Sequence, residues 1–518
     1  MSAPLPTRLP REDEPSRQVR RAAQRAAVRE LRQRQAAQGL APRATATIAN
    51  GTSAWETVAE EREARQDAID EQVTIYRAVL PQLLERLGHI PDPRHAKTVR
   101  HTATALLLYG MLTFVFQMAS RREANRQMTM PMFREHLRLL FPEVETLPHH
   151  DTLHRLLSVI EVDQIEMAML AVVTRFLRQK KFTRHQIADR YPIAIDGTQK
   201  LVRNTCWDGQ CLERQVSSTA ADGTVTKRPQ YYVYVLEATL AFANGLTIPL
   251  MSEFLSYTEG DPVRNKQDCE LKAFTRLTAR LKARFPRLPI LVLLDGLYAN
   301  GPVMARCRQY HWQFMIVLQN GSLPSVWEEV VGRKSLQPHN QTDRTWGDRT
   351  QHFWWVNAID YAYGEHERHH QTVHVVICEE HWDTVDAVTA TIVVQRSRHA
   401  WLSSAPLTRD TVHERCNLGA RHRWGIESHF LVEKKHGYEY EHCFSQNWQA
   451  MKGYHFLMRL GHLLNILASR TARLAQLVGR LGVRGLIRFL RDSCSGPWLA
   501  PAHILALRAL ACGQIRLE

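Results

Sequence analysis

The stretch Ala420-Arg-His-Arg-Trp-Gly-Ile-Glu-Ser-His-Phe-Leu-Val-Glu-Lys434 decides how the rest of the chain is interpreted. An α-helix turns once in about 3.6 residues, so with Arg423 at zero, Glu427 lies at about 40° and Lys434 at about 20°. One carboxylate therefore shares a helix face with two cations. The apolar residues of the stretch are expected to fill other faces: Trp424, Ile426 and Leu431. Because Arg and Glu four residues apart also pair on ordinary helices, the stretch alone favours a solvated, ion-paired face.

Two aspartates earlier in the chain change that interpretation. Asp196 ends an apolar run that begins at Tyr191, and Asp295 ends a stronger run that begins at Leu288. A short apolar run bounded by Pro and Gly predicts a buried strand. A carboxylate at the end of such a strand is costly unless it is paired or binds a cation. Two strand-end aspartates and one helical glutamate therefore predict a site for Mg²⁺, which prefers oxygen ligands.

These residues resemble the DDE triad of insertion-sequence transposases, a family with an RNase H-like catalytic core. Arg423, Glu427 and Lys434 match the last three residues of the family's YREK signature, with three and then six residues between them. The segment Asp295-Gly-Leu-Tyr298 is similar to the motif around the family's second Asp. The resemblance covers roughly residues 190–445.

The signature Tyr is replaced here by Ala420, which lies at about 60° on the same helical projection. Alanine in place of tyrosine is expected to weaken binding to the DNA backbone phosphates and to leave the metal site intact. Replacing Ala420 by Tyr is therefore expected to raise cleavage of DNA ends or to leave it unchanged.

The resemblance implies a function, a cofactor and partners. Asp196, Asp295 and Glu427 would bind Mg²⁺, with Mn²⁺ as a substitute, and would cleave transposon ends and catalyse strand transfer by two-metal phosphodiester chemistry. Arg423 and Lys434 would grip backbone phosphates that flank the scissile bond. The implied partners are double-stranded DNA, as transposon ends and target, and a second copy of the chain in a synaptic homodimer. Two alternatives stay open: an RNase H-like DNA endonuclease without strand transfer, and a non-catalytic DNA-binding protein derived from a transposase.

The composition is that of an ordinary globular protein with excess basic residues. The chain has 518 residues, enough for two or three cores, and 44% are hydrophobic. Its 67 Lys and Arg against 52 Asp and Glu give a net charge of +15, which favours a polyanionic partner such as nucleic acid. Nine scattered cysteines indicate reduced thiols and a cytoplasmic location. No secretory signal is visible, and the interrupted apolar run Thr102–Ala119 favours a buried helix, so no membrane partner is expected.

The pattern of periodicities, with the resemblance, predicts an α/β chain: an RNase H-like mixed sheet with a β-rich insertion, flanked by N- and C-terminal helical regions. The expected divisions are a basic, disordered arm (1–50), a helical DNA-binding domain (51–188), two core parts (189–320 and 412–447, the second with the Glu427 helix), the insertion (321–411) and a C-terminal helical region (448–518). The core elements follow the order β-β-β-α-β-α-β. The spatial order 3-2-1-4-5, implied by the resemblance, would place Asp196 beside Asp295. The pair Asn244-Gly245 predicts a type I′ hairpin.

Basic segments flank the core. Residues 1–48 contain arginines at helical spacing but few large apolar residues, so a disordered or frayed tail is favoured over an arm that folds on phosphates. Short helices with basic turns between residues 55 and 187 suit either DNA-end recognition or an ordinary helical bundle. The arginine stripe from Arg473 to Arg491 is expected to be a solvated face.

Aromatic and cysteine residues supply two further candidates. Trp354 and Trp355 are adjacent on a predicted strand of the insertion, so one is expected in the core, while the other could stack on an unpaired DNA base, as the resemblance implies. Cys206 and Cys211 have a spacing that could hold zinc. Without a second pair of ligands, however, solvated loop thiols are favoured.

Overall fold

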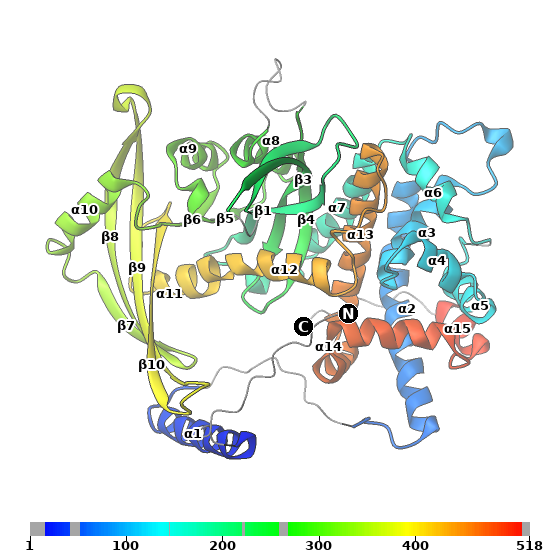
Figure 1. Ribbon diagram of the computed structural model, residues 1–518, viewed down its shortest axis with the longest axis horizontal. Coiled ribbons are helices and arrows are strands. Elements are labelled where there is room, and N and C mark those ends of the chain that lie inside the picture. Colours follow the sequence, from blue (N-terminus) through cyan, green and yellow to red (C-terminus); the bar gives the residue numbers. More distant parts are fainter. Residues whose placement is uncertain (1–15, 42–51, 145, 220–222, 258–267, 510–518) are drawn as a thin grey trace. The chain divides into compact units, whose positions relative to one another are not determined.

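The structure, a computed structural model, describes residues 16–41, 52–144, 146–219, 223–257 and 268–509 (Figure 1). It is mixed α/β with helical N- and C-terminal regions, so the predicted fold class is confirmed. The chain divides into two compact units. The larger unit contains residues 48–298, 306–315 and 414–518, and the smaller contains residues 1–47, 299–305 and 316–413. None of the described helices is both long enough and apolar enough to cross a membrane.

The sheet of the larger unit places its strands in the order β4-β3-β1-β5-β6, which agrees with the order 3-2-1-4-5 expected from the resemblance. The strands are β1 (Tyr191–Arg203), β3 (Val225–Ala241), β4 (Thr247–Leu255), β5 (Ile290–Leu294) and β6 (Gln313–Val317). Strand β3 pairs antiparallel with β1 and β4, and β1 pairs parallel with β5. All five residues of β5 are buried, as a strand covered on both faces requires.

Two details of this sheet differ from the prediction. The strand β2 (Leu212–Thr219), which pairs with the first half of β3, was not expected, because its residues are polar and mostly exposed. The β3–β4 hairpin exists, but its loop has three residues rather than two. Phe242 N–H donates to Leu246 O at 3.0 Å, and only Gly245, at φ 78°, has a left-handed backbone. This combination is typical of a type I turn that ends in a glycine bulge, so the type I′ prediction was wrong.

Helix α13 (Trp448–Ser469) is the central helix of the larger unit, and almost all of its residues are buried. It packs against helices of the N-terminal region and against β4. A Cβ atom at Gly461 would lie 3.1 Å from the backbone oxygen of Met111 in α3 (Ala103–Val115), so glycine allows the two helices to approach closely. The segment 51–188 and the core therefore share one hydrophobic interior.

The other helices of the larger unit surround this interior. They are α2 (Val58–Gly88), α4 (Arg121–Met128), α5 (Pro131–Leu140), α6 (His150–Leu157), α7 (Asp163–Arg178), α8 (Glu270–Arg284), α12 (Trp424–Lys435), α14 (Ala472–Ser495) and α15 (Pro501–Ala509). Helix α9 (Gly301–Gln309) follows β5. In α14, Arg473, Arg480, Arg484 and Arg488 are exposed.

The smaller unit contains the predicted β-rich insertion as an antiparallel ladder with the order β10-β9-β8-β7. Its strands are β7 (Gln341–Trp346), β8 (Arg349–Tyr363), β9 (His369–Val385) and β10 (Ile392–Ser403), and α10 (Pro324–Lys334) packs on β8. The polar run that begins at His366 forms the β8–β9 connection and the start of β9.

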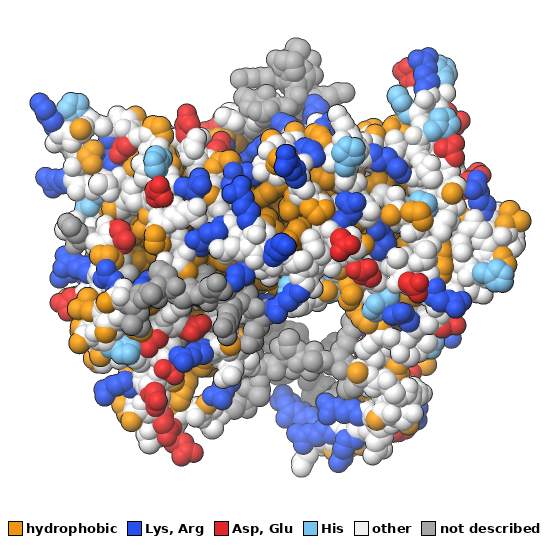
Figure 2. Space-filling model, turned by 180° about the vertical axis from the view of Figure 1, so that it is seen from behind, with side chains coloured by type: hydrophobic (Ala, Val, Ile, Leu, Met, Phe, Trp, Pro, Cys, Tyr) orange, Lys and Arg blue, Asp and Glu red, His pale blue; other side chains and the backbone are white. Residues whose placement is uncertain are grey.

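Part of the expected disordered arm is a helix, α1 (Arg17–Ala37), so the prediction of disorder is wrong for these residues. Ser16 caps the helix by accepting a hydrogen bond from Val19 N–H, and alanines supply high helix propensity. Gln24 donates to Ala387 O at 2.7 Å in the same unit. The helix contains seven arginines and one glutamate, and Figure 2 shows basic side chains gathered along it. Residues 1–15 and 42–51 of the expected arm lie outside the described residues.

Candidate active site and nucleic-acid interface

The parallel pairing of β1 and β5 places Asp196 next to Asp295. Tyr191 pairs with Ile290 and Ala194 with Leu293, an offset of 99 residues, and the same offset joins Asp196 to Asp295. Neighbouring strands lie about 4.8 Å apart. The two aspartates therefore occupy neighbouring positions just beyond the parallel pairing, although they are far apart in the sequence. Asp295 directly follows β5, whereas β1 continues to Arg203 and Asp196 pairs with Glu237 of β3, so the prediction that Asp196 ends a strand was wrong.

Arg423 connects this pair to Glu427. Its guanidinium contacts Asp196 Oδ2 through Nη1 at 3.2 Å and Glu427 Oε1 through Nη2 at 2.7 Å. The side chain of Arg423 is only 8% exposed, whereas that of Glu427 is 39% exposed. Arg423 therefore joins two predicted metal-ligand carboxylates, rather than projecting into solvent as a predicted phosphate contact.

Asp196 is a buried carboxylate with two further carboxylates nearby. Burial raises the pKa of Asp196 to about 6; Arg423 and the Gly197 N–H act to lower it, while Asp295 and Glu427 raise it further. Three carboxylates stand against one guanidinium. A divalent cation would relieve this repulsion, and carboxylate oxygens are the donors that Mg²⁺ takes.

The oxygens of the three carboxylates are not gathered into a preformed metal site. Among the described residues, the only group of three such side chains with all ligand atoms within 4.8 Å of one another lies elsewhere, at His429, Glu433 and His462. The Arg423 guanidinium bridges Asp196 and Glu427. Convergence of all three carboxylates on one cation therefore requires Arg423 to release at least one of them.

The helix that carries Glu427 starts later than predicted. A π-helical turn (Glu414–Gly419) and a 3₁₀ turn (Ala420–Arg423) precede α12. Because Ala420 belongs to the 3₁₀ turn, the prediction of one continuous helix from Ala420 was wrong. The side chain of Ala420 is buried. Ile426 is buried as expected, but Trp424 is 62% exposed and Leu431 is 55% exposed. Of the three apolar residues expected on other faces of the helix, only Ile426 therefore packs in the interior.

Lys434 is already paired. Its Nζ lies 3.1 Å from Glu441 Oε1 and 5.8 Å from the centre of the Tyr440 ring. The side chain is 20% exposed. Contact with a phosphate would therefore compete with Glu441.

Trp354 and Trp355 are both buried, at 7% and 3% exposure, so the prediction that one of them is free to stack on a base was wrong for this conformation. Strand β8 lies between β7 and β9, and α10 covers the Trp354 side, where Lys334 Nζ lies 4.0 Å from the ring centre. Both indoles line a pocket of about 450 Å³, and neither indole N–H has a hydrogen-bond partner among the described residues.

A fourth carboxylate near the two aspartates was missed from the sequence. Glu270, the first residue of α8, accepts hydrogen bonds from Tyr234 Oη at 2.5 Å and Tyr298 Oη at 3.2 Å. Burial, followed by interactions with Glu270, raises the pKa of Tyr234, and the charges of Asp196 and Asp295 add to this effect. Tyr298 belongs to the segment after Asp295 that was noted in the sequence, but no local pattern indicates its partner.

The absence of a side chain at Gly197 leaves room for Tyr234 and Glu270 beside Asp196. A Cβ atom at Gly197 would lie 2.4 Å from Tyr234 Cε1 and 2.5 Å from Glu270 Oε1. A residue with a side chain would displace the tyrosine and the carboxylate, so glycine is required directly after the first aspartate.

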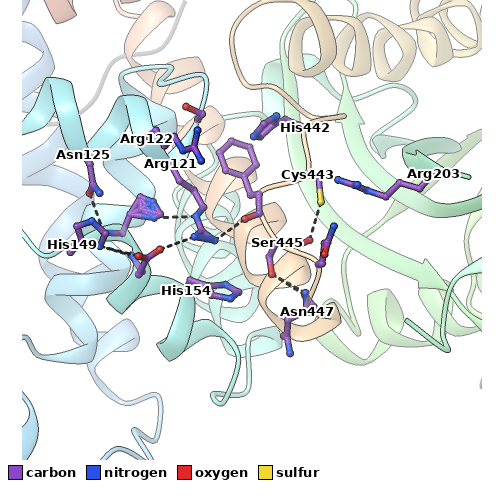
Figure 3. Close-up of a pocket in the computed structure, with 15 residues that line it drawn as sticks. Arg121, Arg122, Asn125, His149, His154, Arg203, His442, Cys443, Ser445 and Asn447 are labelled. Atoms are coloured by element: carbon purple, nitrogen blue, oxygen red, sulfur yellow. Dashed lines mark hydrogen bonds and ion pairs between the residues drawn. The ribbon is translucent and has the colours of Figure 1, made fainter. Parts of the chain in front are cut away.

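An arginine-lined pocket of about 930 Å³ lies in the same unit (Figure 3). Its walls come from α4, the start of α6, the end of β1 and the loop 442–447. Arg121 is held by Asp151 at 2.8 Å and by Phe444 O at 3.2 Å, so it links α4 to that loop. Arg122 is exposed, and Arg203 reaches in from β1; neither has an ion-pair partner among the described residues.

His150 in this arginine pocket is a neutral hydrogen-bond donor rather than a cation. Burial, followed by the charge of Arg121, lowers the pKa of His150 to about 4, so it is neutral at pH 7. His150 Nδ1 accepts from Arg121 Nε at 3.1 Å, because a guanidinium can only donate. Its proton therefore resides on Nε2, which is buried and has no partner among the described residues. The pocket therefore contains two arginines without an ion-pair partner among the described residues, Arg122 and Arg203, and one buried N–H donor in its wall, on His150.

The cysteine pair shows no zinc-binding arrangement in the part of the chain that is described. Cys206 is exposed and Cys211 is buried, and burial raises the pKa of Cys211 to about 11. A neutral thiol is a poor zinc ligand. Neither residue belongs to the histidine–glutamate group noted above.

Comparison with known protein families identifies a match in the N-terminal helical region. Residues 84–173 match a protein family model described as DDE_Tnp_1-associated. The matched segment extends from the end of α2 into α7 and includes the α4 and α6 walls of the arginine pocket. No curated protein matches the chain. The family match indicates a DDE-type transposase family and a transposase-related function.

Proposed function

We propose that the chain is a DNA transposase of the YREK-signature type, with an RNase H-like core that cleaves transposon ends and joins them to target DNA. The observation that carries this proposal is that Asp196 lies beside Asp295 on neighbouring parallel strands and shares the guanidinium of Arg423 with Glu427. The strand order β4-β3-β1-β5-β6 and the family match at residues 84–173 support it independently.

The three carboxylates would hold Mg²⁺, or Mn²⁺ in its place. When bound, a pair of such ions activates water or a 3′-hydroxyl for in-line attack on phosphorus and stabilises the leaving oxygen. Asp196 is positioned within β1 by its pairing with β3, and Asp295 directly follows β5, whereas Glu427 is the most exposed of the three side chains that form the Arg423 ion pairs.

Arg423 has two roles in this account. In the metal-free protein its guanidinium compensates part of the charge of Asp196 and Glu427. Once a cation takes over that compensation, the planar N–H edges of Arg423 can pair with a phosphate beside the scissile bond. Lys434 would contribute a second phosphate contact if Glu441 releases it.

DNA would also be bound in the arginine pocket. Arg122 and Arg203 are unpaired cations, and the His150 Nε2–H is a buried donor that a phosphate oxygen would satisfy. Phosphate contacts of this kind position DNA without reading its sequence. The exposed arginines of α1 and α14 would add electrostatic attraction, and the resemblance to transposases implies a synaptic dimer on paired ends.

The proposal is tested with DNA that carries the sequences on both sides of the gene. Purified protein with Mg²⁺ should release new 3′-hydroxyl ends at defined positions and should then join them to a second, unlabelled DNA. Cleavage without joined products would favour the endonuclease alternative. Tight binding without any cleavage in Mg²⁺ or Mn²⁺ would refute an enzymatic function and favour a non-catalytic DNA-binding protein.

A further inference from the structure

Glu433 differs from every other buried carboxylate among the described residues. Four of these carboxylates have an arginine partner: Glu166 with Arg280, Glu237 with Arg459, Asp268 with Arg276, and Glu380 with Arg349. Glu433 is fully buried, but no Lys or Arg of the described chain lies within ion-pair distance of it. A buried carboxylate without a cation is costly, so something else must compensate its charge.

Two histidines take the place of the missing arginine. His429 Nε2 lies 3.0 Å from Glu433 Oε1 in α12, and His462 Nδ1, from α13, lies 2.9 Å from the same oxygen. The ligand atoms of the three side chains all lie within 4.8 Å of one another, and all three residues are buried. The group therefore has the size of a metal coordination sphere.

Hydrogen bonding does not account for all of these contacts. His462 Nδ1 makes a hydrogen bond to Glu433, but His429 Nε2 has no hydrogen-bond partner despite its short separation from the carboxylate. Glu433 Oε2 also has no partner among the described residues. The cluster thus contains two imidazole nitrogens and two carboxylate oxygens, of which His429 Nε2 and Glu433 Oε2 have no hydrogen-bond partner among the described residues.

The surroundings of His429 suit a metal ligand. Its other ring nitrogen, Nδ1, lies 3.0 Å from Thr247 Oγ1 at the start of β4. Metal-bound histidines commonly donate their second N–H to such an acceptor, which fixes the tautomer and leaves the opposite nitrogen free to coordinate. Imidazole nitrogens select zinc-like transition metals rather than Mg²⁺.

We propose that His429, Glu433 and His462 form a structural site for a zinc-like divalent transition metal that ties α12 to α13. Tetrahedral zinc with bonds of about 2.0–2.2 Å places its donors about 3.3–3.6 Å apart, so small side-chain shifts bring the three side chains to coordination distance. The two imidazoles and one oxygen of Glu433 supply three donors, and a water molecule would supply the fourth. Because α12 also carries Glu427, the site would hold the helix of the third triad carboxylate in place.

The test measures metal in the full chain, purified without a polyhistidine tag, incubated with ZnCl₂ and passed through gel filtration. The proposal predicts about one zinc per chain, and at least a tenfold loss in Glu433→Gln and His462→Asn. Three controls should keep the metal. His455→Asn changes an equally buried histidine of α13 that bonds Ser252 instead, Asp196→Asn changes the triad, and the double change of Cys206 and Cys211 to Ser removes the other zinc candidate.

A measurement on the unchanged protein keeps the proposal testable if those variants fail to fold. Substitution with Co²⁺ should give visible absorption without a sulfur-to-cobalt charge-transfer band, and chelation should lower Tm by at least about 2 °C. The proposal is overturned if the reconstituted protein holds less than about a tenth of an equivalent of zinc, if zinc persists in Glu433→Gln, or if it follows the cysteines. In these cases the cluster is an internal hydrogen-bond network.

Discussion

Replacing Asp196 by Asn should stabilise the metal-free protein while abolishing DNA cleavage. The folded protein raises the pKa of Asp196 from 3.8 to about 6, chiefly through burial. The ionised carboxylate is therefore less stable in the folded chain than in the unfolded one. This penalty is absent below about pH 3.8, grows as the pH rises towards 6, and is constant above it.

The size of the effect follows from the same shift. Roughly two pKa units correspond to about 3 kcal/mol of unfavourable free energy at neutral pH. This shift already includes the favourable effect of Arg423, whose guanidinium lies 3.2 Å from the carboxylate. The expected gain in unfolding free energy is therefore up to about 3 kcal/mol, and Tm should rise by about 2–5 °C at pH 7.5 in EDTA. The gain should shrink as the pH falls from 6 to 4.

Thermal unfolding and nicking of end-containing DNA, measured on the same preparations, test this expectation. The matched control is Asp268→Asn, because Asp268 is a buried carboxylate with an arginine partner, Arg276 at 2.5 Å. The control should lower Tm and keep cleavage, which is the opposite of the expected result for Asp196→Asn. An Asp196→Asn protein that loses stability as the control does, or that still nicks DNA at close to the unchanged rate, would refute the assignment of Asp196 as a metal ligand.

Three further substitutions follow from local geometry. Ala420→Tyr should reduce the free energy of unfolding by about 1–3 kcal/mol in a thermal melt, because Ala420 is buried and a tyrosine ring overfills its site. Unchanged or improved cleavage with an unchanged Tm would instead support the expectation from the YREK signature that a tyrosine is tolerated at this position. Gly197→Ala should lower Tm and displace Tyr234, whose ring would lie 2.4 Å from the new methyl group, and an unchanged Tm would show that this packing is loose. Arg203→Ala should reduce the slope of log affinity against log salt by about 0.9 per lost phosphate contact. The control Arg155→Ala changes an exposed arginine outside the pocket and should leave this slope unchanged. Equal slopes for both variants would exclude the pocket as a DNA contact.

The sequence was informative where a feature depends on a strand or on a fixed spacing. Asp196 and Asp295 are recognisable because apolar runs end at each of them, and the parallel offset of 99 residues in the structure places them side by side. The strand order agrees with the order that the resemblance implied. The apolar runs follow from the local hydrophobic pattern and the strand order from the resemblance, so neither requires knowledge of side-chain contacts.

The features that the sequence did not predict depend on distant partners. Trp354 and Trp355 are both buried because α10 and two neighbouring strands cover β8, which alternation along one strand cannot reveal. Glu270 belongs to the candidate site only because Tyr234 and Tyr298 converge on it from other elements. Helix α12 begins only at Trp424, because a 3₁₀ turn rather than a continuous helix precedes it.

The direct test of the central claim is cleavage of end-containing DNA by four proteins: the unchanged chain, Asp196→Asn, Asp295→Asn and Glu427→Gln. Binding measured in Ca²⁺ and Tm serve as controls for folding and for recognition of DNA. If the three carboxylates form one metal-dependent centre, each single substitution should reduce cleavage in Mg²⁺ by at least about a hundredfold, while binding in Ca²⁺ persists. Cleavage at close to the unchanged rate by any one of these folded variants would contradict the claim that its carboxylate belongs to the catalytic centre.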